Sequence, residues 1–130
     1  MKHFLVAFLL PMTLAAQDMQ QLTEQLGKTV LYGDIALSPD GTHLAWVQST
    51  AASTTKETYI REISGNAPAK LINLPITGGE RTDFDPAWSP DTKTLAFLSN
   101  AGKFSSDPQK DQRQLWTLNA DGSGAKKIPT

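Results

Sequence analysis

Two stretches of the chain, 35–47 and 86–98, carry the same order of hydrophobic, turn-forming and polar residues. The first reads IALSPDGTHLAWV and the second reads PAWSPDTKTLAFL, and the two align without a gap at an offset of 51 residues. In each, a short apolar run is followed by Ser-Pro-Asp and a second apolar run. Proline presets φ at a turn corner and aspartate caps the turn, so each copy predicts a hairpin of two strands.

A second, looser repeat follows each hairpin. TYIREI at 58–63 matches LWTLNA at 115–120, and setting Tyr59 against Trp116 gives an offset of 57 residues because the linker in the second copy is longer. Each unit also ends in a small-residue turn and a short apolar segment. Four antiparallel strands at a period near 50 residues are typical of one blade of a β-propeller. The predicted strands are 34–37, 43–48, 57–63 and 69–72, then 84–88, 94–99, 114–119 and 125–128.

The two predicted hairpin turns differ at the position where a left-handed backbone is expected. Gly41 takes this conformation without strain, whereas the second copy has Thr92. A β-branched residue there would cost on the order of 1 kcal/mol, so we expect the second turn to change type or to be less rigid. The strands that follow, HLAWVQ and TLAFLS, are apolar at successive positions, which is typical of strands covered on both faces.

The first residues have the order of features typical of a secretory signal peptide. Lys2 gives a positive start, FLVAFLL at 4–10 is a short apolar core, Pro11 breaks it, and Ala15 and Ala16 are small residues suited to cleavage. The alternatives are a membrane anchor, for which the run is far below the ~20 residues needed, and a buried N-terminal helix. We predict a secreted or periplasmic protein, cleaved near Ala15 or Ala16, with no membrane association beyond the signal peptide.

The residues after the predicted cleavage site favour a short amphipathic helix at 18–27. Met19, Leu22 and Leu26 fall on one face, and Gly27 is a suitable end. The fold class predicted for the chain is therefore all-β, a partial β-propeller of about two four-stranded antiparallel blades after a signal peptide and a short helix. The predicted organisation is a signal peptide at 1–16, the helix and lead-in at 17–33, the first blade at 34–75 and the second blade at 76–130.

Composition excludes several kinds of chemistry without changing this picture. Of the 130 residues, 39% are hydrophobic and 19% are charged, which is ordinary for a globular chain and argues against general disorder. The formal net charge of -1 gives no electrostatic reason to expect nucleic acid as a partner. The absence of cysteine excludes disulfides and thiolate metal sites, so stability must come from packing.

The repeats resemble those of two related groups of propellers. SPDG-THLAWV, WSPDT-KTLAFLSN and the following QLWTLNADGSGAKKI are similar to TolB-like repeats and to the N-terminal propeller of the prolyl-oligopeptidase family, especially its acylaminoacyl-peptidase and dipeptidyl-peptidase branches. The order of signal peptide, helix and DIALSPDG is more similar to the peptidases. The resemblance covers 34–128. It implies a propeller that caps a separate α/β-hydrolase domain, where a Ser-Asp-His triad has its serine in a G-x-S-x-G elbow.

No catalytic, cofactor-binding or metal-binding residue is predicted in the chain itself. DGSG at 121–124 lacks the spacing of the elbow, and with Lys126 it lacks the spacing of a phosphate loop, so a hairpin turn is favoured. His43, the single histidine after the predicted cleavage site, could be a base or a metal ligand. Without a partner it is more typical of a strand surface.

Aromatic residues recur at equivalent positions of the two units. They could form a stacking surface for sugars or peptides, but their equivalence favours packing between blades. The residues are Trp46, Tyr59, Trp88, Phe97 and Trp116.

Acidic residues and one long loop have a functional and a structural interpretation. Asp83 and Asp85 could bind a cation with Asp40 or Asp91, although capping of turns and strand ends is favoured. The polar stretch 102–112 is predicted as a loop between strands, either solvated or in contact with a substrate or a companion domain.

Two blades leave exposed edges and apolar faces, whereas closed propellers have about four to eight blades. We therefore expect further blades and a C-terminal α/β-hydrolase domain as partners within a larger protein. Under the first hypothesis that protein is an exported serine peptidase with peptide substrates, and this segment gates or binds substrate without catalysis. Under the alternative it is a non-enzymatic TolB-like periplasmic propeller that mediates protein–protein interaction. A short independent binding module and a self-assembling array of short chains are further alternatives.

Overall fold

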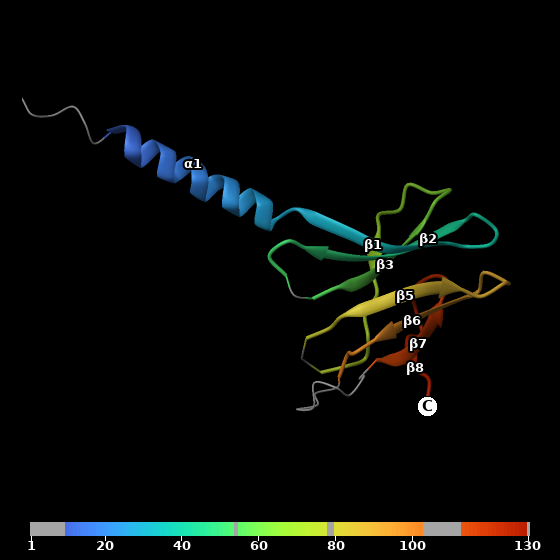
Figure 1. The fold of residues 1–130 in the computed structure, drawn as a ribbon. Helices are drawn as coiled ribbons and strands as arrows, with labels where there is room; N and C mark the ends of the chain where they lie inside the picture. Colours follow the sequence, from blue (N-terminus) through green and yellow to red (C-terminus); the bar gives the residue numbers. More distant parts are fainter. Residues whose placement is uncertain (1–9, 54, 78–79, 103–112, 130) are drawn as a thin grey trace, which may run out of the picture.

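The protein is described by a computed structural model that covers residues 10–53, 55–77, 80–102 and 113–129, with side chains from residue 18 onward. In this part of the chain one helix is followed by eight strands (Figure 1). In chain order the elements are α1 (Leu10–Gly27), β1 (Val30–Leu37), β2 (His43–Thr50), β3 (Glu57–Glu62), β4 (Lys70–Leu71), β5 (Asp83–Trp88), β6 (Thr94–Ser99), β7 (Gln114–Asn119) and β8 (Lys126–Lys127).

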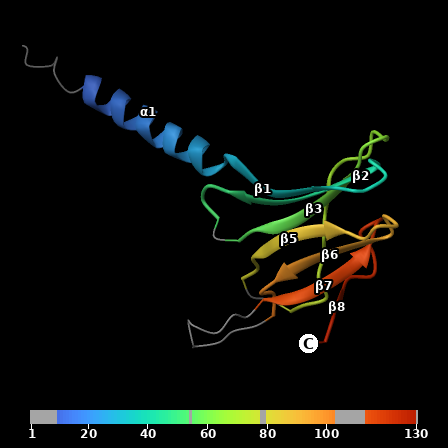
Figure 2. The ribbon, with the colours of Figure 1, turned by 45° about the vertical axis from the view of Figure 1, so that its right-hand side comes forward.

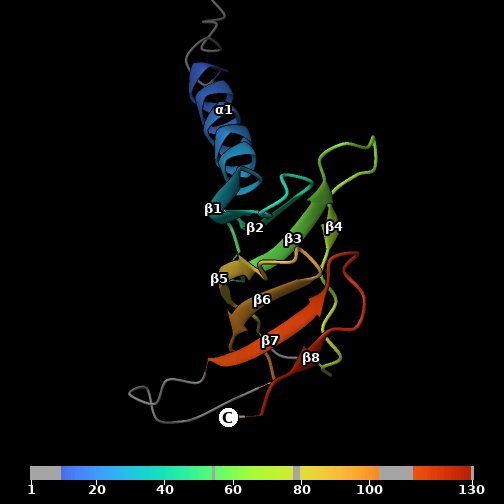
Figure 3. The same cartoon turned by 90° about the vertical axis from the view of Figure 1, so that its right-hand side faces the viewer.

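The strands form two four-stranded antiparallel sheets in sequential order, β1-β2-β3-β4 and β5-β6-β7-β8. Figures 2 and 3 show the sheets as two stacked layers, with α1 extending away from the first. Each sheet has the strand order of one propeller blade, so the predicted fold class is confirmed. We call β1–β4 blade 1 and β5–β8 blade 2.

The first strand of each blade, β1 or β5, contains a bulge that was not predicted from the sequence. The register of β1 shifts between Gly33 and Ala36, and that of β5 shifts at the equivalent position. Asp34 and Asp85, at the repeat offset of 51 residues, both adopt positive φ there, 45° and 49°. Aspartate tolerates this conformation better than most residues. Because the bulge lets pairing resume on its far side, β1 begins at Val30, earlier than predicted.

Hydrogen bonds of the Ser-Pro-Asp sequence explain the shape of the hairpin turn in blade 1. The Ser38 hydroxyl donates to the Asp40 carboxylate over 2.7 Å and accepts the His43 N–H over 2.9 Å. The Thr42 hydroxyl donates to the same carboxylate over 2.7 Å. Hydrogen bonds from Thr42 and Ser38 lower the pKa of Asp40 to about 2, so the carboxylate stays ionised and holds the turn at neutral pH.

The blade 2 turn keeps the backbone bond and the serine-to-aspartate bond of the blade 1 turn, although Lys93 replaces Thr42 and Thr92 replaces Gly41. The Thr92 N–H donates to the Ser89 carbonyl over 2.9 Å, as Gly41 does to Ser38 over 2.9 Å. Thr92 adopts φ 62°, close to the 73° of Gly41. The expectation that this turn changes type is therefore wrong. The Ser89 hydroxyl donates to the Asp91 carboxylate over 2.6 Å, and this fixed geometry outweighs the local strain at Thr92.

The second strands of the two blades are covered differently. In β2 the three successive residues Ala45, Trp46 and Val47 are buried, as expected for a strand with both faces covered. In β6 burial alternates, with Leu95 and Phe97 buried and the residues between them only half-buried. The prediction is wrong for β6 because, among the described residues, blade 1 covers a single face of blade 2.

The helix ends at Gly27, as predicted, but begins at Leu10 rather than at residue 18, and its Gly27 end is bound to blade 1. The Ala52 N–H donates to the Gly27 carbonyl over 3.2 Å. The side chains of Met19, Leu22 and Leu26 are exposed. No helix in the described ranges is long and apolar enough to cross a membrane. Residues 1–9, the first part of the predicted signal peptide, lie outside the described residues.

The hydrophobic core lies between the blades. Blade 1 and the segment after it contribute Ala45, Ile60 and Ile72, and blade 2 contributes Leu95, Phe97, Trp116 and Leu118. Each large aliphatic or aromatic side chain buried here contributes about 1.5–3 kcal/mol. The core therefore stabilises the pair of blades as one unit.

Gly122, in the β7–β8 turn, packs against this core and has φ +84°. We expect Gly122→Ala to lower the free energy of unfolding by about 1–2 kcal/mol from left-handed strain and crowding. An added Cβ would lie 3.0 Å from Ile60 Cδ1 and 3.3 Å from Ile72 Cδ1. Chemical denaturation of the protein containing the chain measures the effect. Gly33→Ala is the control, because a Cβ there meets nothing within 4 Å. Equal stability of the two variants would contradict this account.

Candidate functional site

The main polar site of the described structure lies where the chain passes from blade 1 to blade 2. Lys56 forms a parallel bridge with Thr82 across the two blades. The Lys56 N–H donates to the Arg81 carbonyl over 3.1 Å, and the Asp83 N–H donates to the Lys56 carbonyl over 2.9 Å. These backbone contacts bring the start of β5 against the start of β3.

Arg81 and Asp83 form a buried ion pair at this junction. The Arg81 residue is 8% exposed and Asp83 is 0% exposed. Arg81 Nε donates to Asp83 Oδ1 over 2.9 Å, and Nη2 donates to Oδ2 over 2.5 Å, so the guanidinium binds the carboxylate through two nitrogens. Arg81 Nη1 also donates to the Ile72 carbonyl over 2.6 Å. This fork geometry suits a guanidinium better than an ammonium group.

Blade 1 completes the coordination of the Asp83 carboxylate. Thr58, the second residue of β3, donates to Asp83 Oδ2 from its backbone N–H over 2.9 Å and from its hydroxyl over 2.7 Å. A buried carboxylate without partners would cost several kcal/mol. The carboxylate, which belongs to blade 2, thus accepts bonds from blade 1 and from the segment that links the blades, and its burial is possible only while the blades are in contact. We call Thr58, Arg81 and Asp83 the junction network.

The junction network was not foreseen from the sequence. The sequence pattern predicts no role for Arg81, and for Asp83 and Asp85 it predicts a cation site with Asp40 or Asp91, or capping of turns and strand ends. The structure does not bring these aspartates together, because Asp40 and Asp91 bind within their own turns. Asp85 is exposed at the bulge while Asp83 faces blade 1. The Arg-x-Asp spacing was an available signal, because alternate residues of an extended segment share a face.

No group of three or more histidine, aspartate or glutamate side chains in the described part of the chain could hold a metal ion. His43, predicted at a strand surface, is half-buried at the start of β2. Its Nδ1 lies 2.7 Å from the Thr42 hydroxyl, and its ring centroid lies 5.5 Å from that of Trp88 in blade 2. His43 therefore packs between the blades. The predicted turn at 121–124 is confirmed, with the Asp121 carboxylate accepting the Ser123 N–H over 2.9 Å.

The predicted aromatic residues fall into two groups. Three of them, from blade 2, pack against one face of blade 1, and two lie on the opposite face of blade 1. Trp88, Phe97 and Trp116 pack toward blade 1, which confirms their predicted role, and Trp88 Nε1 donates to the carbonyl of Ala36 over 3.1 Å. Trp46 and Tyr59 do not take part in this interface. They stack on each other, with ring centroids 5.9 Å apart, on the opposite face of blade 1.

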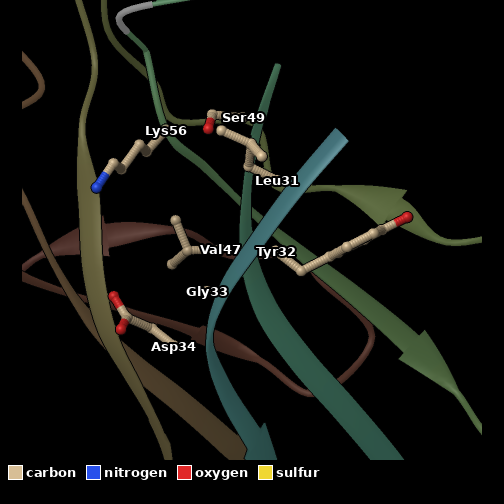
Figure 4. A pocket seen from close by; sticks show the side chains of 7 residues that line it. All are labelled: Leu31, Tyr32, Gly33, Asp34, Val47, Ser49 and Lys56. Atoms are coloured by element: carbon tan, nitrogen blue, oxygen red, sulfur yellow. The ribbon is translucent and has the colours of Figure 1, made fainter. Parts of the chain in front are cut away.

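Of the shallow hollows in the described structure, one lies beside the junction and a larger one lies beside β7 and β8. The first, about 150 Å³, is bounded by β1, β2 and Lys56. Figure 4 shows the side chains of Asp34 and Lys56 on one side of β1 and Tyr32 on the other. The second, about 400 Å³, lies beside Ile76, Trp116 and neighbouring residues of β8. Neither set of lining residues contains a histidine beside a serine, so neither offers a nucleophile with its base. The predicted loop lies outside the described residues from 103 to 112.

Two sequential four-stranded antiparallel blades that share a core define this chain as part of a β-propeller. A solved structure described as TolB from Agrobacterium tumefaciens is similar, with a TM-score of 0.51 and 17% sequence identity over 74% of this chain and 32% of that chain. At this level of identity the likeness shows the fold alone.

Sequence relatives connect the chain with peptidases. It is 35% identical over 95 residues to YuxL of Bacillus subtilis, described as an uncharacterised peptidase, covering 73% of this chain and 13% of the relative. It is also 35% identical over 69 residues to a tricorn protease homolog of Streptomyces coelicolor, covering 53% and 6% of the respective chains. No family model matches. The chain is thus a propeller-like, peptidase-associated segment that spans a small part of its relatives' length.

The junction network predicts a large difference between two aspartates of the same strand. Asp83→Asn leaves the buried Arg81 guanidinium without its counter-charge, and we expect a loss of about 3–5 kcal/mol in the free energy of unfolding. Asp85→Asn is the matched control, because this residue is exposed and asparagine tolerates its positive φ. It should change stability by less than about 0.5 kcal/mol. Urea titration followed by tryptophan fluorescence measures both, and similar losses would refute the assignment.

Proposed function

We propose that this chain is the N-terminal propeller segment of an exported serine peptidase, in which it gates or binds peptide substrate and is itself non-catalytic. The observation that carries this proposal is the 35% identity to a peptidase over 95 residues, a length sufficient for both blades. The structure supports the role of the segment, because Thr58, Arg81 and Asp83 are buried polar residues that hold the two blades together. The triad would then belong to a C-terminal α/β-hydrolase domain.

A gate of this kind would select substrates by their size, and its channel wall would have to be rigid. Further blades of the parent protein would complete the ring around a channel, and an extended peptide could pass where a folded protein could not. Blades held by a shared core and a buried ion pair resist separation, since parting them exposes the Asp83 carboxylate and the Phe97 ring together. The junction network would therefore keep the channel wall closed during turnover.

The TolB-like fold supports one alternative. Under it the parent is a non-enzymatic periplasmic propeller whose outer surface binds other proteins, and no hydrolase domain exists. Fold similarity at 17% identity favours neither activity by itself. The peptidase proposal is preferred because two sequence relatives carry peptidase or protease names.

The complete protein containing the chain tests the proposal through its reactivity. A fluorophosphonate probe should label one serine, and chromogenic peptides of a few residues should be hydrolysed while folded proteins remain intact. The labelled serine should lie in a G-x-S-x-G sequence downstream of residue 130. Absence of both labelling and hydrolysis, together with a downstream sequence made only of further Ser-Pro-Asp repeats, would establish the TolB-like alternative instead.

Export is part of the same proposal and has its own test. When the protein is produced in a bacterium, mass spectrometry of the periplasmic fraction should find a mature N-terminus at Ala16 or Gln17. Leu9→Arg, which interrupts the apolar core of the signal peptide, should leave the uncleaved protein in the cytoplasm. Thr23→Arg, beyond the predicted cleavage site, is the matched control and should be exported normally. Retention of Met1 on exported protein would contradict the cleavage.

A further inference from the structure

Among the described residues, the indole N–H of Trp116 is buried without a hydrogen-bond partner. The residue is 4% exposed, and no acceptor lies within reach of its Nε1. The other two tryptophans are satisfied, since Trp88 Nε1 donates to the Ala36 carbonyl over 3.1 Å and Trp46 Nε1 donates to the Gln48 amide oxygen over 3.0 Å. Buried indoles usually have an acceptor, because a buried donor without one destabilises the fold. The Trp116 indole is therefore a donor that a ligand could satisfy.

The Trp116 ring borders the hollow of about 400 Å³ beside β7 and β8. The other walls of this hollow are mainly apolar and come from the segment that links the blades and from the turns of blade 2. They include Pro75, Ile76, Ala101 and Ala125. Sites for small molecules are typically hollows of about 300–1,000 Å³ with apolar walls and a few polar groups. The hollow therefore has the size and the lining of a small-molecule site.

Lys127 adds a positive charge on the same face of blade 2. It lies directly opposite Trp116 in the pairing of β7 with β8, and opposite residues of an antiparallel pair share a face. In blade 1 the equivalent pair is Tyr59 with Leu71, so the blade fold itself does not require a lysine here. Lys127 is exposed and forms no ion pair with any other residue that the structure describes. Its ammonium group is thus available to an anion at the hollow.

The polar groups of the hollow select the charge of a ligand. An indole N–H and an ammonium group can bind only acceptors, and the ammonium favours a charged one. A phosphate group carries close to two negative charges, which a single ammonium does not balance, whereas a carboxylate carries one. Gln114, buried at the start of β7, also lines the hollow, and its amide can bind an uncharged polar group. The apolar walls then suit an apolar substituent beside the carboxylate.

We propose that this hollow binds a small monocarboxylate with an apolar group, such as an N-acylated apolar amino acid, and that its carboxylate accepts hydrogen bonds from Trp116 Nε1 and Lys127 Nζ. Neighbouring groups shield Nε1 from solvent, so binding includes a rearrangement of side chains at the rim, as is common at binding surfaces. The site lies on the face of blade 2 that is turned toward blade 1. A further blade packed on the opposite face of blade 2 would leave it open. The inference goes beyond the proposed function, because binding here requires neither a hydrolase domain nor a closed channel.

Nuclear magnetic resonance of the complete protein containing the chain, with nitrogen-15 in its tryptophan indoles, tests the proposal. The protein is first treated with a fluorophosphonate, which closes the active site of a serine hydrolase to the ligand. The Trp116 resonance is the one that Trp116→Phe removes. Titration with N-acetyl-leucine should shift this resonance downfield until it saturates, because the indole N–H gains an acceptor. N-acetyl-leucinamide keeps the apolar group without the charge and should bind about fivefold more weakly.

Calorimetric titration of the same protein with N-acetyl-leucine tests the role of the charge. Lys127→Gln, at an exposed position, should weaken binding about two- to fivefold, the range expected for an exposed ion pair. Lys28→Gln, in the exposed link between α1 and β1, removes the same charge away from the hollow and should bind like the unaltered protein. This comparison remains decisive if Trp116→Phe fails to fold.

Three results would each overturn the proposal. They are a set of indole resonances that N-acetyl-leucine leaves unmoved, equal affinity for the acid and the amide, and equal affinity of Lys127→Gln and Lys28→Gln for the acid. The first result would also follow if another part of the complete protein filled the hollow. Binding is measured with the hydrolase site blocked, so a protein that binds N-acetyl-leucine but hydrolyses no peptide would refute the peptidase proposal alone.

Discussion

The Asp83 carboxylate, fully buried between two blades, is the constraint on which the described structure depends. It is bound from one side by Arg81, whose guanidinium also reaches the Ile72 carbonyl, and from the other side by Thr58. A buried charge is tolerated only when its partners are all in place. The network therefore specifies the relative position of the blades more strictly than the apolar core could, because hydrophobic contacts are non-directional.

The apolar contacts around this network follow the internal repeat. Blade 1 presents small or β-branched side chains to blade 2, and blade 2 inserts Phe97 and Trp116 against the Ala45 face of blade 1. Trp46 and Tyr59, equivalent to core residues of blade 2, stack on each other on the opposite face of blade 1.

Fold and sequence similarity fit a role in a peptidase at the level of architecture. Asp40 and Asp91 hold turns, and Asp83 holds the junction. Under the proposed function, the segment would restrict and position substrate, and bond cleavage would require the nucleophile and base of another domain. The proposal rests on the 35% identity over 95 residues to YuxL, which is described as an uncharacterised peptidase.

The sequence alone determined the blades, their strand order and the turns, because these depend on contacts between residues close along the chain. Ser38 and Asp40 lie two residues apart, and the alternation of β3 and β7 is local. Only the tertiary structure decided which face of each blade is buried against the other blade. The bond from Thr58 to Asp83 joins residues 25 apart, and the bulge at Asp85 turns an exposed carboxylate away from the buried one. Sequence periodicity gives the face that a residue occupies within its strand, but not which blade covers that face.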